Sequence, residues 1–208
     1  MKISYAITVC NEAREFRKLL DFLVPLVYRE DEIVVLQDVS KESKEVNKVF
    51  IDFADYTETR VTSKFEGDFA AWKNMLNSYC KGDYIFQIDA DEIPEEALIK
   101  NLPMLLDLNP DVDLFWVPRW NTVEGITVQD LQNWHWALDN KKRINWPDYQ
   151  GRIYRNAPRI RWEGKVHEKI VGHKKYSFLP DSCYLHHDKT IEKQRSQNSL
   201  YSKIQQNG

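Results

Sequence analysis

The chain has few glycines and cysteines, and it lacks a long apolar run. Its 208 residues include 7 glycines and 3 cysteines. No stretch approaches the roughly 20 apolar residues that a membrane-spanning helix needs. Cys10, Cys80 and Cys183 are odd in number and have no metal-type spacing, so we interpret them as reduced thiols of a cytoplasmic protein. The N-terminal segment MKISYAITVC is too short and too strand-like for a signal peptide.

An excess of charge of one sign is also missing. The net charge is −3, and 29% of the residues are charged against 42% that are apolar. This balance excludes a general polyanion binder, so nucleic acid is not expected as a partner. It is also typical of a globular chain rather than a disordered one. The length fits one domain with a core of ordinary size.

Apolar runs and helical patterns alternate over the first 110 residues. Runs that predict strands and patterns that predict helices follow one another at 3–9, 16–23, 33–36, 42–54, 58–62, 69–79, 84–88 and 94–106. Asp68 is a suitable N-cap for the third helix, and Pro94 is expected to open the fourth. Strands that alternate with helices predict an α/β domain with a largely parallel sheet.

The pattern changes after residue 110. We expect a strand at 113–120, an aromatic and loop-like segment at 121–150, and a polar helix at 190–206. Short strands are expected between these segments, at 152–154, 159–162 and 165–170. The terminal helix is not strongly amphipathic, and docking of this helix on a membrane or a partner stays open.

Polar side chains follow three of the expected strands. The first strand ends in Asn11-Glu12, the second in Asp38, and the fourth in Asp89-Ala90-Asp91. Ligands of open α/β sheets bind beyond the carboxyl ends of the parallel strands. We therefore expect the three polar clusters to meet on one rim of the sheet and to form a binding site there.

The acids after residue 88 predict a metal site. Side chains two apart on an extended chain point the same way, with Cα atoms roughly 6.5 Å apart, so Asp89 and Asp91 can face one point. Two such carboxylates repel unless a cation lies beside them, and oxygen ligands suit Mg²⁺ or Mn²⁺. The alternative is a solvated helix N-terminus, which is how we interpret Glu92, Glu95 and Glu96.

The motifs together resemble a known family. ITVCNEA, EIVVLQDVSKE, DFAAWKN and GDYIFQIDADEIPEE follow one another as in the family 2 nucleotide-sugar glycosyltransferases, which have the GT-A fold. YQGRIYRN, IRWEGKVHEKI and YLHHD resemble the branch that includes lipopolysaccharide-core and protein-modifying transferases. The family's second strand typically ends Asp-Asp-Gly-Ser, whereas here it reads Gln37-Asp38-Val39-Ser40. The resemblance implies a mixed, mainly parallel central sheet flanked by helices.

The resemblance also implies a donor site. It places the nucleotide-sugar, with a UDP-sugar as the first candidate, against Thr8, Asn11, Glu12, Asp38, Asp68, Asn74 and Asp89. Asp38 would meet the base or the ribose. Asp68 has an equal alternative as the helix N-cap, and Asn74 either contacts the nucleotide or braces a loop. The resemblance further implies a nucleotide-binding half at about 1–92, an acceptor half at 93–189 and a C-terminal helix at 190–208.

A divalent metal, Mn²⁺ or Mg²⁺, is implied as the cofactor. The resemblance assigns Asp89 and Asp91 to it, together with a late histidine. His186 and His187 are the candidates, and His187 is preferred. The alternative is a strand-end histidine pair without a ligand.

The segment Val166-His167-Glu168 resembles the one that carries the family's catalytic base. A carboxylate within reach of the acceptor hydroxyl can take its proton, so Glu168 is the candidate base for attack with inversion at the anomeric carbon. A salt bridge to one of the nearby cations is the alternative explanation for Glu168. The acceptor is an unidentified glycan, lipid-linked molecule or protein.

The late part of the chain is basic and aromatic. Residues 141–175 hold eleven lysines and arginines against three acids, and six of the seven tryptophans lie at 116–162. Four arginines could meet a diphosphate or an anionic acceptor, although each by itself is better explained as part of a solvated face: Arg152, Arg155, Arg159 and Arg161. Residues 121–150 could form a lid, and their NWHWALDN stretch suits either a sugar-stacking wall or ordinary packing.

Two other functions stay open. A sugar-phosphate nucleotidyltransferase also joins an α/β nucleotide fold to acids and a metal, but it usually opens with a glycine-rich loop. This chain has Cys10-Asn11-Glu12-Ala13 after the first strand instead. A non-catalytic carbohydrate- or nucleotide-binding module would be expected to have lost an acid at the metal site, and no such acid is missing. We therefore favour a metal-dependent glycosyltransferase that is cytoplasmic, with a peripheral position at the inner face of a membrane left open.

Overall fold

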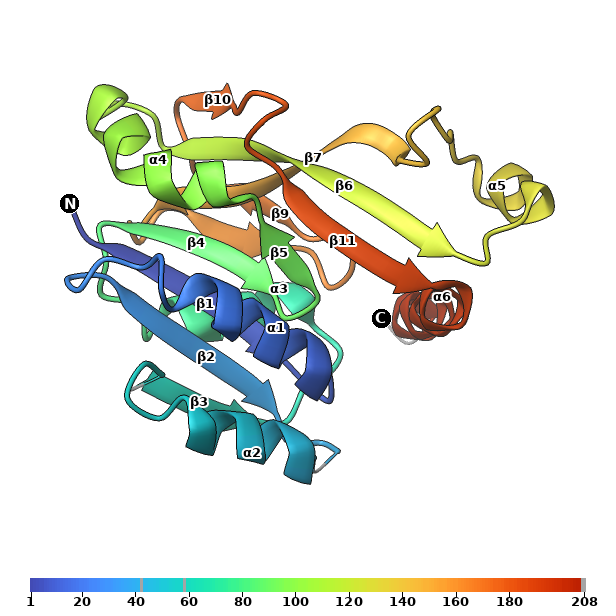
Figure 1. The fold of residues 1–208 in the computed structure, drawn as a ribbon, viewed down its shortest axis with the longest axis horizontal. Coiled ribbons are helices and arrows are strands. Elements are labelled where there is room, and N and C mark those ends of the chain that lie inside the picture. Colours follow the sequence, from blue (N-terminus) through green and yellow to red (C-terminus); the bar gives the residue numbers. More distant parts are fainter. Residues whose placement is uncertain (42, 58, 207–208) are drawn as a thin grey trace.

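A computed structural model describes residues 1–41, 43–57 and 59–206. Residues 42 and 58, where the second helix and the third strand were expected to begin, lie outside the described residues, as do 207–208 of the terminal segment. The described chain forms one large mixed sheet, with helices on both of its faces (Figure 1).

The N-terminal part of the sheet is parallel, as the sequence predicts. Its strands lie in the order β3-β2-β1-β4. Their bounds are Ile3–Val9 for β1, Glu32–Asp38 for β2, Thr59–Ser63 for β3 and Tyr84–Asp89 for β4. The helices between them are α1 (Ala13–Leu23), α2 (Lys44–Asp52) and α3 (Phe69–Asn77). All four carboxyl ends therefore lie at the same edge.

The second half of the sheet contains both parallel and antiparallel pairs, and two of its strands are longer than the sequence predicts. β7 (Ile144–Arg155) runs antiparallel between β4 and β6 (Leu114–Glu124), and so joins the two halves. β11 (Leu185–Thr190) then pairs in parallel with β6 and antiparallel with β5 (Glu92–Pro94). β10 (Tyr176–Phe178) pairs with the start of β6.

Two expectations for this half were wrong. Segment 121–150 is not loop-like, because β6 continues to Glu124, α5 covers Val128–Trp134 and β7 begins at Ile144. The strands in this segment are half-exposed and carry polar residues, so the sequence lacks the apolar run that usually indicates a strand. Pro94 does not open a helix either. Pro94 is the last residue of β5 and pairs with Leu185 of β11. Helix α4 begins at Glu96 and ends at Leu108.

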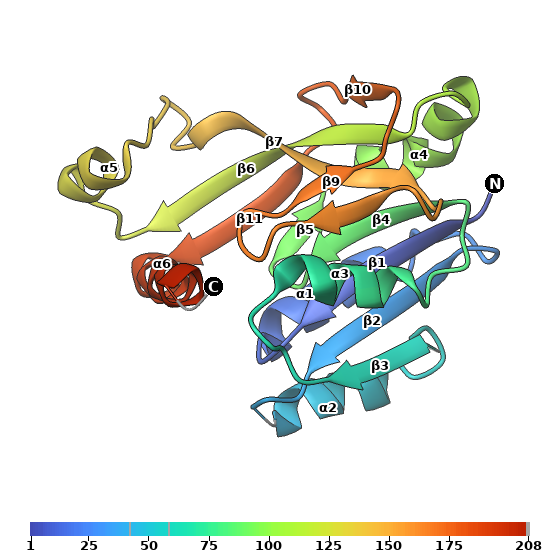
Figure 2. The ribbon, with the colours of Figure 1, turned by 180° about the vertical axis from the view of Figure 1, so that it is seen from behind.

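The sheet separates two hydrophobic cores. In the view of Figure 1, α1, α2 and α4 cover the near face, and α3 covers the far face that Figure 2 shows. The near core depends on helical periodicity, since α1 buries Phe16, Leu19, Leu20 and Leu23. On the far face, Trp72 and Leu76 of α3 pack with residues of the hairpin formed by β8 (Arg161–Glu163) and β9 (Lys169–Val171).

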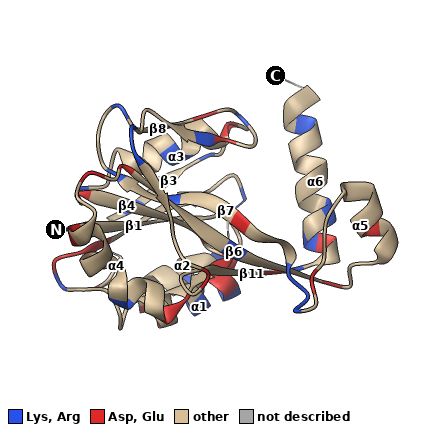
Figure 3. Cartoon of the chain, turned by 90° about the horizontal axis from the view of Figure 1, so that it is seen from above, with Lys and Arg blue, Asp and Glu red and all other residues tan. Residues whose placement is uncertain are grey.

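The C-terminal helix α6 (Ile191–Gln206) follows β11 directly and agrees with the expected helix. Seen from above, it rises at one end of the sheet, across from α3 and β8 (Figure 3). Tyr201 on α6 packs against Phe69 of α3 and against His167, with ring centroids 5.6 and 5.5 Å apart. Among the described helices, none has the length and apolar character to cross a membrane.

Gly172 at the end of β9 gives a test of how tightly the hairpin is anchored. A Cβ added at Gly172 would lie 1.8 Å from the carbonyl oxygen of Arg159, whereas one at Gly67 would have no atom nearer than 3.9 Å. Both glycines have φ near +80°, at +81° and +82°. Gly67→Ala should therefore cost about 1–2 kcal/mol from backbone strain alone. Gly172→Ala should cost about 1–3 kcal/mol more because of the clash. Urea unfolding measures both, and equal losses would contradict this packing.

Candidate active site

The polar ends of the parallel strands meet on one rim, as the sequence predicts. The Thr8 hydroxyl at the end of β1 donates to Asp89 Oδ1 at the end of β4, over 2.9 Å. The Cys10 thiol donates to Asp38 Oδ2 at the end of β2, over 3.4 Å. Side chains up to 81 residues apart in sequence are thereby brought into contact.

Asp38 is held as an ionised acceptor. It accepts hydrogen bonds from the Ser40 amide and hydroxyl at 2.8 and 2.7 Å, and from the Phe65 amide at 3.1 Å. Burial raises the pKa of Asp38, but these hydrogen bonds outweigh burial and its pKa lies below the usual value. Burial and the nearby Asp38 charge raise the pKa of Cys10 to about 12, so this thiol stays protonated.

Other residues expected in the donor site have local partners. Glu12 accepts from the backbone amides of Cys10 and Asn11, at 2.9 and 3.1 Å. Asp68 caps α3 by accepting from the Ala71 amide at 2.8 Å. Asn74 donates to the carbonyl of Trp162 and accepts from its amide, both at 2.9 Å. The N-cap alternative for Asp68 and the bracing alternative for Asn74 thus both describe contacts that are present.

A buried ion network lies beneath the acidic turn. The Arg152 guanidinium donates to Asp89 Oδ2 at 2.8 Å and to Glu92 Oε1 at 2.5 Å. Glu92 is completely buried and also pairs with Arg119, at 3.1 Å. Loss of hydration would raise the pKa of Asp89, but the charges of Arg152 and Lys73 hold it well below the usual value.

This network corrects two interpretations of the sequence. Glu92 is not a solvated helix-terminal acid, since its side chain is 0% exposed, and Arg152 is not part of a solvated face, since its side chain is 3% exposed. Glu95 and Glu96 do lie at the N-terminus of α4, as expected. Among the other three arginines of that group, Arg155 and Arg159 pair with Asp113, and Arg161 pairs with Glu163 on an exposed surface.

Asp91 points to a different set of partners. Its Oδ2 lies 3.5 Å from Nε2 of His187 in β11 and 3.1 Å from Nζ of Lys193 in α6. Burial raises the pKa of Asp91, but the contact with His187 and the lysine charges outweigh it, so the pKa lies well below the usual value. Burial lowers the pKa of His187, which favours the neutral imidazole. His186 instead lies 3.1 Å from Glu95. The structure therefore brings His187, and not His186, to Asp91.

Glu168 lies on the far side of the acidic turn. It precedes β9, and its Oε1 accepts from Nζ of Lys73 over 2.6 Å. Both side chains are largely buried, and the Lys73 ammonium also lies 4.4 Å from the centre of the Trp162 ring. The salt bridge that the sequence left open as an alternative is thus present. Burial, together with the charges of Asp89 and Glu168, raises the pKa of Tyr201 on α6 to about 12.

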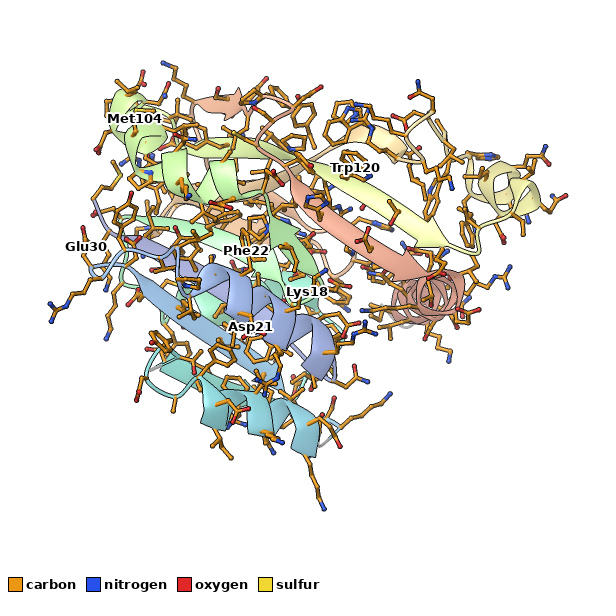
Figure 4. The ribbon with its side chains drawn as sticks, viewed as in Figure 1. Lys18, Asp21, Phe22, Glu30, Met104 and Trp120 are labelled. Carbon is orange, nitrogen blue, oxygen red and sulfur yellow. The ribbon has the colours of Figure 1, made fainter. Side chains whose placement is uncertain are left out.

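A groove opens beside Asp91 on the face covered by α1. Its volume is about 550 Å³, and it lies between α1, β6, β11 and the start of α6. Lys18 of α1 lines one wall (Figure 4), and Lys193 and Asp188 line the other. Glu168 and Asp38 do not line this groove within the described part of the chain. The groove therefore adjoins the rim at Asp91, but the candidate donor residues do not line it within the described residues.

Four of the seven tryptophans form two groups. Trp134 and Trp136 of the NWHWALDN stretch lie 4.8 Å apart and pack against Val123, Ile144 and Ile191, which favours the packing alternative for that stretch. Trp120, labelled in Figure 4, lies on β6 beside a cluster of rings. Its ring centroid is 5.4 to 6.0 Å from those of Trp146, Tyr184 and His186.

A complete protein-only metal cage is not present among the described residues. No group of three or more histidine, cysteine, aspartate or glutamate side chains is placed to hold a metal ion there. Asp91 and His187 are a pair, and Asp89 is turned toward Arg152. Sequence reasoning did not single out Arg119, Lys73, Lys193 or Tyr201, because a single cation or tyrosine has no motif of its own.

The sheet order and the acid-rich rim define a domain of the GT-A architecture. The sequence model of glycosyl transferase family 2 matches residues 4–163. This match spans most of the chain, and the chain belongs to glycosyl transferase family 2. The family expected from the sequence is thereby confirmed.

Solved structures of TarS from S. aureus share the fold. TarS 1–349 superposes with a TM-score of 0.60 at 17% identity, over 90% of this chain and 60% of TarS 1–349. The complex of TarS 1–349 with UDP-GlcNAc gives a TM-score of 0.62 at 17% identity, over 91% and 59%. The complex with UDP gives 0.63 at 17% identity, over 98% and 65%. The chain thus spans about three fifths of TarS 1–349. A comparison with curated proteins finds no match.

The buried network predicts a large effect of removing its cation. Arg152→Met leaves the carboxylate of Glu92 in the interior with Arg119 as its remaining cationic partner, and removes the cation that pairs with Asp89. We expect a loss of about 3–5 kcal/mol in the free energy of unfolding, measured by guanidinium denaturation. Arg161→Met, which breaks the exposed pair with Glu163, is the matched control and should cost less than about 1 kcal/mol. Losses of the same size in both variants would contradict the network.

Proposed function

We propose that the chain is a metal-dependent glycosyltransferase that moves a sugar from a nucleoside diphosphate sugar to an acceptor hydroxyl. Family membership supports glycosyl transfer, and the polar rim supports a nucleotide site at the carboxyl ends of β1, β2 and β4. A UDP-sugar is the first donor to test, in keeping with the complexes of TarS with UDP-GlcNAc and UDP. The pairing of Asp91 with His187 is the observation that carries the proposal.

The pair fits a divalent cation. Asp91 comes from the turn after β4 and His187 from β11, and the two side chains face each other with 3.5 Å between Oδ2 and Nε2. Neighbouring ligands of an octahedral Mg²⁺-sized ion, at about 2.1 Å from the ion, lie about 3 Å apart. A carboxylate and an imidazole together suit Mn²⁺. Asp89 would stay beside the ion as a donor contact or a further ligand, with Arg152 on its other oxygen.

The ion, when bound, would supply Lewis-acid stabilisation of the departing diphosphate. Asp91 and His187 would hold it at the rim. Lys73 and Lys193 are placed to offset the negative charge of the donor, since each already lies against an acid of the site. Asp38, fixed by Ser40 and the Phe65 amide, would accept hydrogen bonds from the base or the ribose.

Glu168 is proposed as the general base. Lys73 binds its Oε1, so the carboxylate is held in one orientation and its Oε2 is the atom that would take the acceptor's proton. A base on the side opposite the leaving diphosphate gives in-line attack, and we propose that the anomeric configuration is inverted. Tyr201 on α6 packs against His167, the residue that precedes Glu168.

Asp91→Ala tests the metal assignment. Without this carboxylate the cation loses a charged ligand, so UDP should no longer bind more tightly when Mn²⁺ is added. Thermal shift with UDP, with and without Mn²⁺, measures this, because a ligand of the native state raises the melting temperature. The same assay with a panel of nucleotide-sugars identifies the donor.

Asp188→Ala is the matched control for that experiment. Asp188 lies in β11 next to His187, and its carboxylate accepts a hydrogen bond from the Thr122 hydroxyl. This variant should keep the Mn²⁺-dependent gain. A gain that is as large in Asp91→Ala as in the wild type would place the metal elsewhere.

Glu168→Gln tests the base. It preserves the shape of the side chain and removes its basicity, so donor binding should persist while transfer falls by about 10²–10⁴. The released UDP is measured with the donor that the thermal screen identifies. Glu163→Gln on the exposed face of β8 should leave turnover close to the wild-type value. Near-normal turnover of Glu168→Gln would assign the proton transfer to another group.

A further inference from the structure

His187 has a second set of contacts, on the side away from Asp91. Its Nδ1 lies 2.7 Å from Oδ1 of Asn121, the residue directly opposite it on β6. Asn121 Nδ2 in turn donates to Oδ2 of Asp148 on β7, over 2.7 Å. Three adjacent strands therefore contribute one side chain each to a chain of hydrogen bonds that ends at the proposed metal site.

The orientation of the Asn121 amide follows from Asp148. Arg119 donates two hydrogen bonds to Asp148 Oδ2, at 3.0 and 2.7 Å, and Gln150 donates to Oδ1 at 2.8 Å. Burial raises the pKa of Asp148, but the Arg119 charge and these hydrogen bonds keep the pKa below the usual value. An ionised carboxylate only accepts hydrogen bonds. The NH₂ group of Asn121 must therefore face Asp148, and its carbonyl oxygen must face His187.

The Asn121 carbonyl then determines which nitrogen of His187 carries the proton. A carbonyl oxygen only accepts, so Nδ1 must be the donor in the 2.7 Å contact. In a neutral imidazole the other nitrogen, Nε2, then has a free lone pair. That nitrogen faces Asp91 Oδ2, which is also an acceptor. Two acceptors facing each other are unfavourable unless a cation lies against them.

We propose that Asn121 and Asp148 are positioning residues that hold His187 in the Nδ1–H tautomer and so present Nε2 to a divalent cation at Asp91. The inference rests on the proposed function for its metal, but the tautomer itself is a property of the metal-free protein. Lys193, at 3.1 Å from the same carboxylate oxygen, supplies positive charge there in the metal-free protein. Second contacts of this kind typically change metal affinity by about 10–100-fold.

Nitrogen-15 NMR of the metal-free protein tests the tautomer directly. Long-range proton–nitrogen correlations of ¹⁵N-histidine-labelled protein distinguish Nδ1–H, Nε2–H and doubly protonated rings. His187→Gln identifies the signals of this ring among those of the 5 histidines. We expect His187 to be the Nδ1–H tautomer at pH 7.5. An Nε2–H or a doubly protonated ring in the wild type would overturn the inference.

Two variants test the direction of the hydrogen bonds. Asn121→Leu removes the acceptor, so His187 should change to the Nε2–H tautomer, and Mn²⁺ binding measured by electron paramagnetic resonance should weaken about 10–100-fold. The exchange Asn121→Asp with Asp148→Asn keeps the composition and net charge. In this double variant the amide at position 148 can donate to the carboxylate at position 121, and that carboxylate can accept from Nδ1–H of His187. Both the tautomer and the Mn²⁺ affinity should therefore return toward wild type.

The outcomes separate this inference from the proposed function. An Nδ1–H ring in a wild-type protein that does not bind Mn²⁺ supports the positioning role and removes the metal function. Mn²⁺ binding at Asp91 together with an Nε2–H ring in the metal-free protein supports the metal function and overturns the positioning role. Failure of the exchange variant to restore affinity, with its fold intact by circular dichroism, would also overturn the positioning role. If Asn121→Leu does not fold, the wild-type spectrum and the exchange variant still decide.

Discussion

The Arg152 guanidinium is the cation on which the acidic rim depends. Its side chain is 3% exposed, and its Nη2 donates both to Asp89 and to the buried Glu92. Because Arg152 comes from β7, the strand that joins the parallel half to the mixed half, this contact also fixes how the two halves meet. The contacts of Arg152 with Asp89 and Glu92 therefore fix both ends of the turn at 90–91. The Asp91 side chain faces β11 and α6. One acid of the pair, Asp89, is neutralised by Arg152, and the other, Asp91, is paired with Lys193, which an added cation would displace.

Three acids of the candidate site have cationic partners, and each partner comes from a different element. Asp89 pairs with Arg152 of β7, Asp91 with Lys193 of α6, and Glu168 with Lys73 of α3. Buried charges need such partners, since an unpaired ion in the interior is costly. In the proposed function, Lys73 and Lys193 would also contact the diphosphate of the donor. Tyr201 and Lys193 both come from α6, so the C-terminal helix contributes to both sides of the acidic turn.

Strand ends and motif order were predictable, whereas cross-strand partners were not. The parallel strands, the rim and the N-cap at Asp68 follow from local patterns of apolar and polar residues, which the sequence displays directly. Glu92 has the same local setting as Glu95, and its burial depends on Arg119 and Arg152, which lie 27 and 60 residues away. Likewise, β6 and β7 carry polar residues that line the site, so their strand pattern resembles a loop. The preference for His187 over His186 agrees with the alternation of a strand, because successive side chains point to opposite faces.

A crystal structure with Mn²⁺ and UDP tests the account most directly. Anomalous scattering locates the manganese independently of the surrounding model. We predict a single strong peak at about 2.0–2.3 Å from an Asp91 oxygen and from His187 Nε2, with Lys193 moved from Asp91 toward the diphosphate. UDP bound at the rim with no anomalous peak at this corner, and with Lys193 still paired to Asp91, would contradict it.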